Sequence, residues 1–256
     1  MLTKGGASPN MSIRSTASFF SLGGTLPVDS PSYIARRADQ EILKTLINRE
    51  YALVLDSRQK GKSSLLARTA SELNGLGYET IKLDLQRFGS TLSAEQWYAT
   101  MLFASAEQLN DSSGAKQFWA ERDSMGAGER WIQYLENRAT QSEKGLIVFI
   151  DEIDYVRSLP FDTDELFALI RSSFNHRSES KLVEKLSFCF SGASSPAGLV
   201  RNPDNGQMII GRRIQLDDFR FEEIAPYASM LASEEGVGFS LLRKIYSWTN
   251  GHPYLT

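Results

Sequence analysis

Cysteine and histidine are scarce in this sequence, which has one cysteine and two histidines in 256 residues. A single cysteine excludes an internal disulfide framework and fits a reducing compartment. Cys189 lies inside the apolar run LSFCFSG, which favours a buried structural thiol over a nucleophile. His176 and His252 have no metal-ligand spacing to each other or to the cysteine, so a metal site built from these residue types is not supported.

Long apolar runs and a strong net charge are also missing. No apolar stretch approaches the roughly eighteen residues that a membrane-spanning helix needs, and the N-terminal segment lacks the continuous apolar region of a signal peptide. With 28 basic and 31 acidic residues, the formal net charge of −3 provides no general attraction for nucleic acid or an anionic membrane. We therefore expect a cytoplasmic protein without membrane association, for which nucleic acid is a disfavoured partner.

The chain does have enough apolar content for a full core, because 41% of its residues are hydrophobic and 11% aromatic. We expect a disordered leader over residues 1–18 and a main folded unit over residues 19–220. A helical insert at 92–141 carries three tryptophans, for which a buried core is favoured over a partner surface. A helical segment is expected over residues 221–256.

Short apolar runs alternate with amphipathic patterns of helical period along the main unit. Strands are expected at 51–55 and 80–86, in GLIVFIDEID at 145–154, in KLSFCFSGASSP at 185–196, which has a polar end, and at 212–216. Strands that alternate with helices imply a parallel sheet covered on both faces. The predicted fold is therefore an α/β fold with a mainly parallel five-stranded sheet flanked by helices, followed by a C-terminal helical segment.

The segment DSRQKGKSS, between the first strand and the next helix, has the order expected of a phosphate-binding loop. Gly61 lets the backbone approach a phosphate, Lys62 offers a mobile ammonium, and the Ser63 hydroxyl can ligate Mg²⁺. The residues expected to bind nucleotide phosphates from this segment are Arg58, Gln59, Lys60, Gly61, Lys62, Ser63 and Ser64.

One position departs from the usual phosphate-loop pattern, because Asp56 stands where the first glycine is normally found. On the Gly-Lys-Ser tripeptide alone, a helix cap on a solvated basic loop is an equal alternative. Lys60 and Arg58 are candidates to compensate the carboxylate. We expect Asp56 to turn back and accept hydrogen bonds from N–H groups of its own loop.

Two carboxylates end the buried strand LIVFIDEID, about ninety residues after the lysine. In this geometry Asp151 can hold Mg²⁺, together with Ser63, and Glu152 can polarise the water that attacks a γ-phosphate. Lys62 and Glu152 are thus the predicted catalytic residues. The alternative is that these acidic residues merely end a strand. This alternative is weaker, because the lysine loop precedes the acidic strand in the order that a phosphate-binding site of this kind requires.

Two further phosphate contacts are less specific. Ser194 follows the fourth predicted strand and is a candidate to contact the γ-phosphate, although an ordinary serine-rich turn before Pro196 explains it equally well. Arg212 begins the fifth predicted strand, where it is either a phosphate sensor or one of a solvated pair of edge arginines.

Together, the segments YIARRADQEI, DSRQKGKSS, IVFIDEID, RSLPF and GHPYLT resemble the AAA-like ATPase domain of cyanobacterial and other bacterial proteins. That family is similar to the STAND class of P-loop signalling NTPases. The resemblance implies that Ile34 and Arg36 lie in the segment that cups an adenine, and that Pro253 packs on the base. Residues 19–220 would then be the NTPase core, with Walker A and Walker B motifs, and 221–256 the start of a helical lid.

The resemblance also implies a function. We expect a switch domain that binds Mg²⁺ and ATP or ADP and hydrolyses ATP slowly, and that associates with itself or with a protein partner through C-terminal regions beyond this chain. A nucleotide-binding scaffold that does not hydrolyse ATP is the first alternative. A DNA-handling ATPase is the second, and it is weaker because no basic stripe is present.

Overall fold

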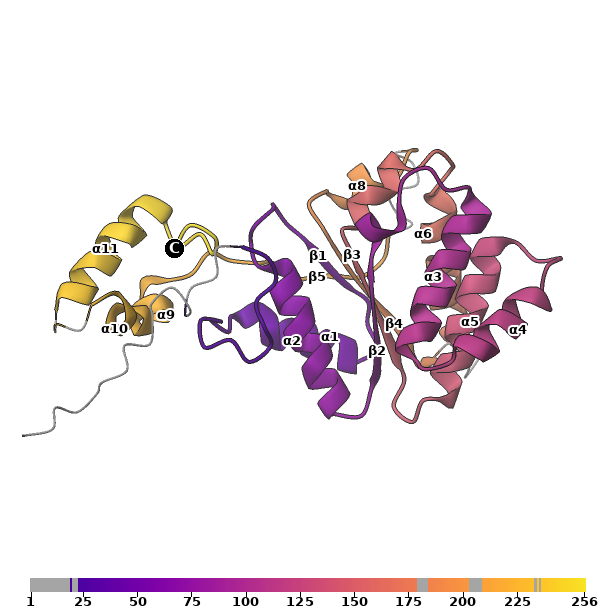
Figure 1. Cartoon of the computed structure of the whole chain (residues 1–256), viewed down its shortest axis with the longest axis horizontal. Helices are drawn as coiled ribbons and strands as arrows, with labels where there is room; N and C mark the ends of the chain where they lie inside the picture. Colours follow the sequence, from indigo (N-terminus) through magenta and orange to yellow (C-terminus); the bar gives the residue numbers. More distant parts are fainter. Residues whose placement is uncertain (1–18, 20–22, 179–183, 203–208, 233, 235) are drawn as a thin grey trace, which may run out of the picture.

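The computed structural model describes residues 19, 23–178, 184–202, 209–232, 234 and 236–256, so the expected leader at 1–18 lies outside the described residues. A five-stranded sheet forms the centre of the chain, in the order β2-β3-β4-β1-β5 (Figure 1). Its strands are β1 (Ala52–Leu55), β2 (Glu79–Asp84), β3 (Leu146–Asp151), β4 (Leu186–Gly192) and β5 (Arg212–Arg213). All four strand pairings are parallel, which confirms the predicted α/β sheet.

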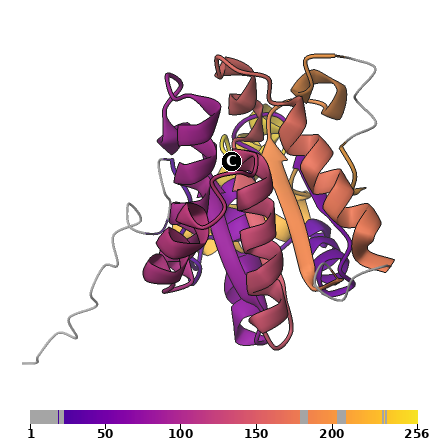
Figure 2. The same cartoon turned by 90° about the vertical axis from the view of Figure 1, so that its right-hand side faces the viewer.

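Helices cover both faces of the sheet, and this follows from the alternation of side chains along each strand. One face carries α1 (Arg37–Ile47) and α2 (Lys62–Gly75). The other carries α3 (Ala94–Gln108), α5 (Ala127–Gln141) and α6 (Asp164–Asn175), with α4 (Ser112–Ala120) outside them (Figure 2). In β1, Leu53 and Leu55 face the second set of helices, while Ala52 and Val54 face the first.

The predicted helical insert consists of α3, α4 and α5, and its tryptophans belong mainly to the core. Trp97 and Trp131 are fully buried, whereas Trp119 is partly buried. Trp97 packs edge-to-face on Tyr98 with ring centroids 5.0 Å apart. The interpretation of this region as core is therefore confirmed for the two buried tryptophans.

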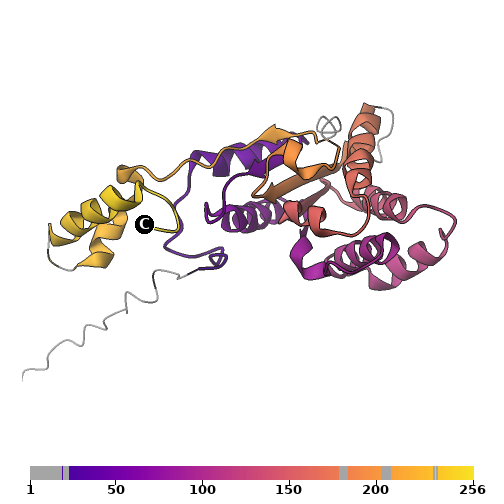
Figure 3. The same cartoon turned by 90° about the horizontal axis from the view of Figure 1, so that it is seen from above.

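The C-terminal helices lie apart from the sheet and have a small core of their own (Figure 3). They are α9 (Phe221–Ile224), α10 (Ala228–Leu231) and α11 (Val237–Thr249). Residues 214–220, here called the linker, connect them to β5. The described residues also form short helical turns: η2 (Leu85–Phe88), η3 (Ile153–Ser158), η4 (His176–Ser178), α8 (Pro196–Leu199) and η6 (Ala225–Tyr227). Among the described helices, none combines the length and apolar character that a membrane crossing requires.

Candidate nucleotide site

The segment from Asp56 to Gly61, here called the phosphate loop, joins the end of β1 to the start of α2. Two residues in it adopt left-handed backbone conformations, Gln59 with φ 63° and Gly61 with φ 81°. A Cβ on Gly61 would lie 3.2 Å from a terminal nitrogen of Arg36, so a side chain is disfavoured there by both conformation and space. The first N–H groups of an α-helix have no partner within the helix, so the start of α2 is suited to an anion.

Lys62 is buried beneath the loop rather than extended into solvent. Its Nζ donates hydrogen bonds to the carbonyl oxygens of Asp56 at 2.8 Å and Ser57 at 2.6 Å. Burial lowers the pKa of the ammonium, while the carboxylates of Glu152 and Asp56 act in the opposite direction. A buried cation that donates to two neutral carbonyls is well suited to exchange them for the oxygens of an anionic ligand.

The carboxylate of Asp56 turns back onto its own loop. Its Oδ1 accepts a hydrogen bond from the backbone N–H of Ser57 at 2.7 Å and one from the Ser57 hydroxyl at 3.3 Å. This is the local bond expected from the sequence. The residue that replaces the usual first glycine therefore stabilises the loop's conformation.

The acidic pair lies at the end of β3. Asp151 is its last residue, and Glu152 follows in a left-handed conformation with φ 52° and donates its N–H to Asp151 Oδ1 at 3.0 Å. Burial raises the pKa of Glu152, and repulsion from Asp151 and Asp154 raises it further. The positive charge of Lys62 acts in the opposite direction and lowers the pKa of Glu152.

The donors near the loop fit Mg²⁺ better than a soft metal. The Ser63 hydroxyl and the Asp151 carboxylate would supply oxygen ligands, and magnesium usually keeps water and phosphate oxygens in its remaining positions. Within the described ranges, no cluster of three or more histidine, cysteine, aspartate or glutamate side chains could hold a metal ion by itself. The residues present are therefore compatible with a magnesium ion that arrives with its nucleotide.

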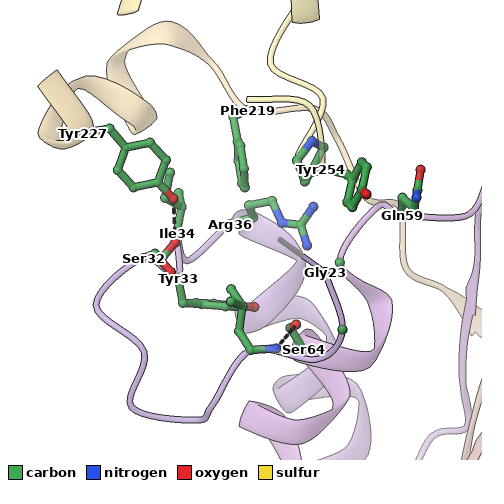
Figure 4. Close-up of a pocket in the computed structure, with 14 residues that line it drawn as sticks. Gly23, Ser32, Tyr33, Ile34, Arg36, Gln59, Ser64, Phe219, Tyr227 and Tyr254 are labelled. Atoms are coloured by element: carbon green, nitrogen blue, oxygen red, sulfur yellow. Dashed lines mark hydrogen bonds between the residues drawn. The ribbon is translucent and has the colours of Figure 1, made fainter. Parts of the chain in front are cut away.

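A cavity of about 340 Å³ lies between the start of α2, residues 23–36 and the C-terminal helices (Figure 4). Six of the residues expected to bind nucleotide line it: Ile34, Arg36, Gln59, Gly61, Ser64 and Pro253. Segments from three separate parts of the sequence thus meet beside the phosphate loop. The cavity has the size and mixed polarity of a small-ligand site.

Sequence reasoning missed several residues of this cavity. The N–H of Leu26 donates to the Ser64 hydroxyl at 2.9 Å, and the Tyr227 hydroxyl donates to the backbone oxygen of Ser32 at 2.5 Å (Figure 4). Tyr254 also lines the cavity, next to Pro253. The glycine pair before Leu26 was the only signal in the sequence that its backbone comes close to another segment.

Ser194 and Arg212 occupy different surroundings. Ser194 shares an open hollow with Arg58 beside Asp154, whose Oδ1 accepts the N–H of Ala193 at 2.7 Å. Arg212 pairs with Ala52 at the beginning of β1 and is exposed, whereas the phosphate loop follows the end of that strand. The structure therefore brings Ser194 near the acidic strand end but does not bring Arg212 to the loop.

Comparison with known proteins agrees with this geometry. The sequence profile of the AAA-like domain family matches residues 21–256, and the chain belongs to this family. An uncharacterized WD repeat-containing protein of Synechocystis is 31% identical over 242 residues, which are 93% of this chain and 20% of that protein. The chain thus spans about a fifth of the length of this curated relative.

Solved structures show the same fold at low sequence identity. A Walker-type ATPase of Pyrococcus abyssi is similar with a TM-score of 0.58 at 15% identity, over 91% of this chain and 68% of that one. The ORC2 protein of Aeropyrum pernix, solved as ADPNP and ADP complexes, gives 0.52 at 14% identity over 80% and 55%. The chain therefore has the P-loop ATPase fold, which is a nucleotide-binding fold.

Proposed function

We propose that this chain is a switch domain that binds Mg²⁺-ATP and hydrolyses it slowly. One observation supports the proposal above the others: the buried Lys62 at the start of α2 and the acidic pair at the end of β3 lie at the same edge of the parallel sheet, and the phosphate loop borders a cavity of about 340 Å³. The fold supports ATP as the ligand class. The slow rate, the switching role and a cytoplasmic location are parts of the proposal.

Each residue has a definite task in this scheme. Lys62 would exchange its loop carbonyls for phosphate oxygens, and Ser63 and Asp151 would hold the magnesium ion, which neutralises phosphate charge when bound. Glu152 would accept a proton from the attacking water. Its raised pKa suits this task, because a general base works best when its pKa approaches the working pH.

The base would occupy the cavity between Ile34 and Pro253. Tyr227, from the C-terminal helices, contacts the backbone of Ser32 in the wall of that cavity. Nucleotide binding would therefore alter contacts between the sheet and the C-terminal helices, and this is how the nucleotide state would reach another copy of the chain or a protein partner.

Phosphate release from the purified chain tests the proposal. We expect release by the wild type with Mg²⁺-ATP, no release above background by Lys62→Ala, and a decrease of about 100-fold or more in Glu152→Gln. Glu143→Gln, in the turn before β3, is the matched control for loss of one glutamate charge and should hydrolyse at the wild-type rate. The absence of any difference between wild type and Glu152→Gln would reject hydrolysis at this site.

A nucleotide-binding scaffold is the second candidate, and the aspartate at the head of the loop favours it. Asp56 adds a negative charge to the loop that would surround the phosphates, although its carboxylate turns back to accept the N–H of Ser57. Equal ATP binding by wild type and Glu152→Gln, with no phosphate release by either, would support the scaffold.

A further inference from the structure

The phosphate loop is joined to the linker by side chains that the proposed chemistry does not use. Lys60, directly before Gly61, places its Nζ 2.5 Å from the Asp218 carboxylate in the linker. Arg36 donates to the backbone oxygen of Lys60 at 2.9 Å and to that of Asp217 at 3.5 Å. Two cations therefore tie the loop to the segment that leads to the C-terminal helices.

The next linker residue continues this connection toward the C-terminal helices. The Arg36 Cζ lies over the Phe219 ring, 5.5 Å from the ring centroid. Figure 4 shows the two side chains next to each other. The Phe219 N–H donates to the backbone oxygen of Gly251 at 2.8 Å. A chain of contacts thus runs from Lys60 through Asp218 and Phe219 to the turn that carries Pro253.

The Lys60–Asp218 pair has the character of an exchangeable contact. Its side chains are 14% and 35% exposed, so the pair is shielded but still open to solvent. Lys60 belongs to the loop that would surround the phosphates, and a triphosphate carries several more negative charges than one carboxylate. Phosphate and Asp218 would therefore compete for one ammonium group.

Resting on the proposed function, we propose that Asp218 is a competing anion that holds Lys60 away from the phosphates in the nucleotide-free chain. Binding of a triphosphate transfers the ammonium of Lys60 from Asp218 to phosphate. The linker then loses its ion pair with the loop and becomes freer to move. Lys60 thus binds phosphate directly and couples this binding to the linker.

Calorimetric titration with tripolyphosphate and with Mg²⁺-ATP tests this competition. Asp218→Asn removes the competitor and should bind both ligands about two- to fivefold more tightly than wild type, the range expected for a partly exposed ion pair. Asp217→Asn removes the neighbouring charge, keeps the carbonyl that Arg36 contacts, and should leave the affinity unchanged. In a Lys60→Met background, Asp218→Asn should have no effect.

Hydrogen exchange of the linker provides a second readout that does not depend on affinity. Addition of Mg²⁺-ATP should increase exchange at residues 217–224 in the wild type, and Asp218→Asn should show the increase without nucleotide. Unchanged or weaker binding by Asp218→Asn, or an equal effect in the Lys60→Met background, would overturn the inference while the proposed function stands. A wild type that binds neither ligand would overturn both.

Discussion

The two sides of the candidate site differ greatly in packing. The sheet and its helices share extensive cores on both faces, with the bulky side chains of Trp97, Trp131 and Phe149 fully buried. Among the described residues, the core of the C-terminal helices contains Ile224, Tyr227, Ala228 and Leu242, together with Phe219 of the linker. Their helix α11 leaves Trp248 84% exposed. A strongly packed half and a weakly packed half therefore meet at the cavity.

This difference assigns distinct tasks to the two halves. The phosphate loop and the acidic pair are positioned by the sheet, whose stability keeps their geometry fixed. The base side of the cavity depends on a few contacts to helices with little core of their own, and such regions open at lower free energy than the rest of a protein. Ligand binding should accordingly change the C-terminal helices more than the sheet.

Replacing one tryptophan in each half should give the largest difference in the free energy of unfolding. Trp97→Ala should lower the free energy of unfolding by about 3–5 kcal/mol, because it leaves a cavity in the main core. Trp248→Ala should change it by no more than about 0.5 kcal/mol, because the indole is exposed. Chemical denaturation followed by circular dichroism measures both. Similar losses in the two variants would contradict the contrast.

A methyl group added at Gly251 should destabilise the C-terminal helices and leave the sheet unaffected. A Cβ at Gly251 would lie 1.9 Å from the backbone oxygen of Phe219, and the residue has φ 77°. We expect Gly251→Ala to destabilise the C-terminal helices by about 1–3 kcal/mol, seen as faster hydrogen exchange in α11 with unchanged exchange in β3.

The matched control for this change is a glycine with free space around it. Gly75, at the end of α2, has no atom within 4 Å of an added Cβ. Gly75→Ala should leave exchange in α11 as in the wild type, and it should keep or raise stability by about 0.4–1 kcal/mol. Faster exchange in α11 with this control would show that the effect is not local.

The hydroxyl of Tyr227 offers a smaller test of the boundary between the halves. Its bond to Ser32 connects the C-terminal helices to the cavity wall, so Tyr227→Phe should weaken this connection by about 0.5–1.5 kcal/mol. Nucleotide affinity should fall, because the ligand must then order the cavity wall without the help of this hydrogen bond. Tyr246→Phe, whose hydroxyl makes no hydrogen bond within the described residues, should retain wild-type affinity.

The smallest expected effect concerns the charge of Glu152. Its pKa is raised in the folded chain, so the ionised form is disfavoured there and costs stability above that pKa. Below the ordinary glutamate pKa the group is protonated in both states and the cost vanishes. Glu152→Gln should therefore melt slightly higher than wild type at neutral pH and equally at low pH, and a reversed order in thermal melts would contradict the assigned environment.

Much of the fold and half of the site could be predicted, because they depend on residues that are close together in the sequence. The phosphate loop and the acidic strand end each consist of neighbouring residues, and parallel strands bring their carboxyl ends to the same edge of a sheet. The sequence order alone therefore indicated that Lys62 and Glu152 would meet.

The base side of the site could not be predicted in the same way, because its contacts join distant segments. The bond from Leu26 to Ser64 spans 38 residues, and that from Tyr227 to Ser32 spans 195. The surroundings of Arg212 also could not be predicted from the sequence. The residue type suits a phosphate sensor, but its position depends on the register of a two-residue strand, which places it beside Ala52.

Calorimetric titration of the chain with Mg²⁺-ATP, alongside Lys62→Ala, tests the central claim most directly. If the lysine and the acidic pair converge on a bound triphosphate, the wild type will release or absorb heat with one-site saturation, and Lys62→Ala will bind at least tenfold more weakly, a loss of about 1.4 kcal/mol or more. Equal saturation curves for the two proteins, or no heat from the wild type at any ATP concentration, would contradict the account.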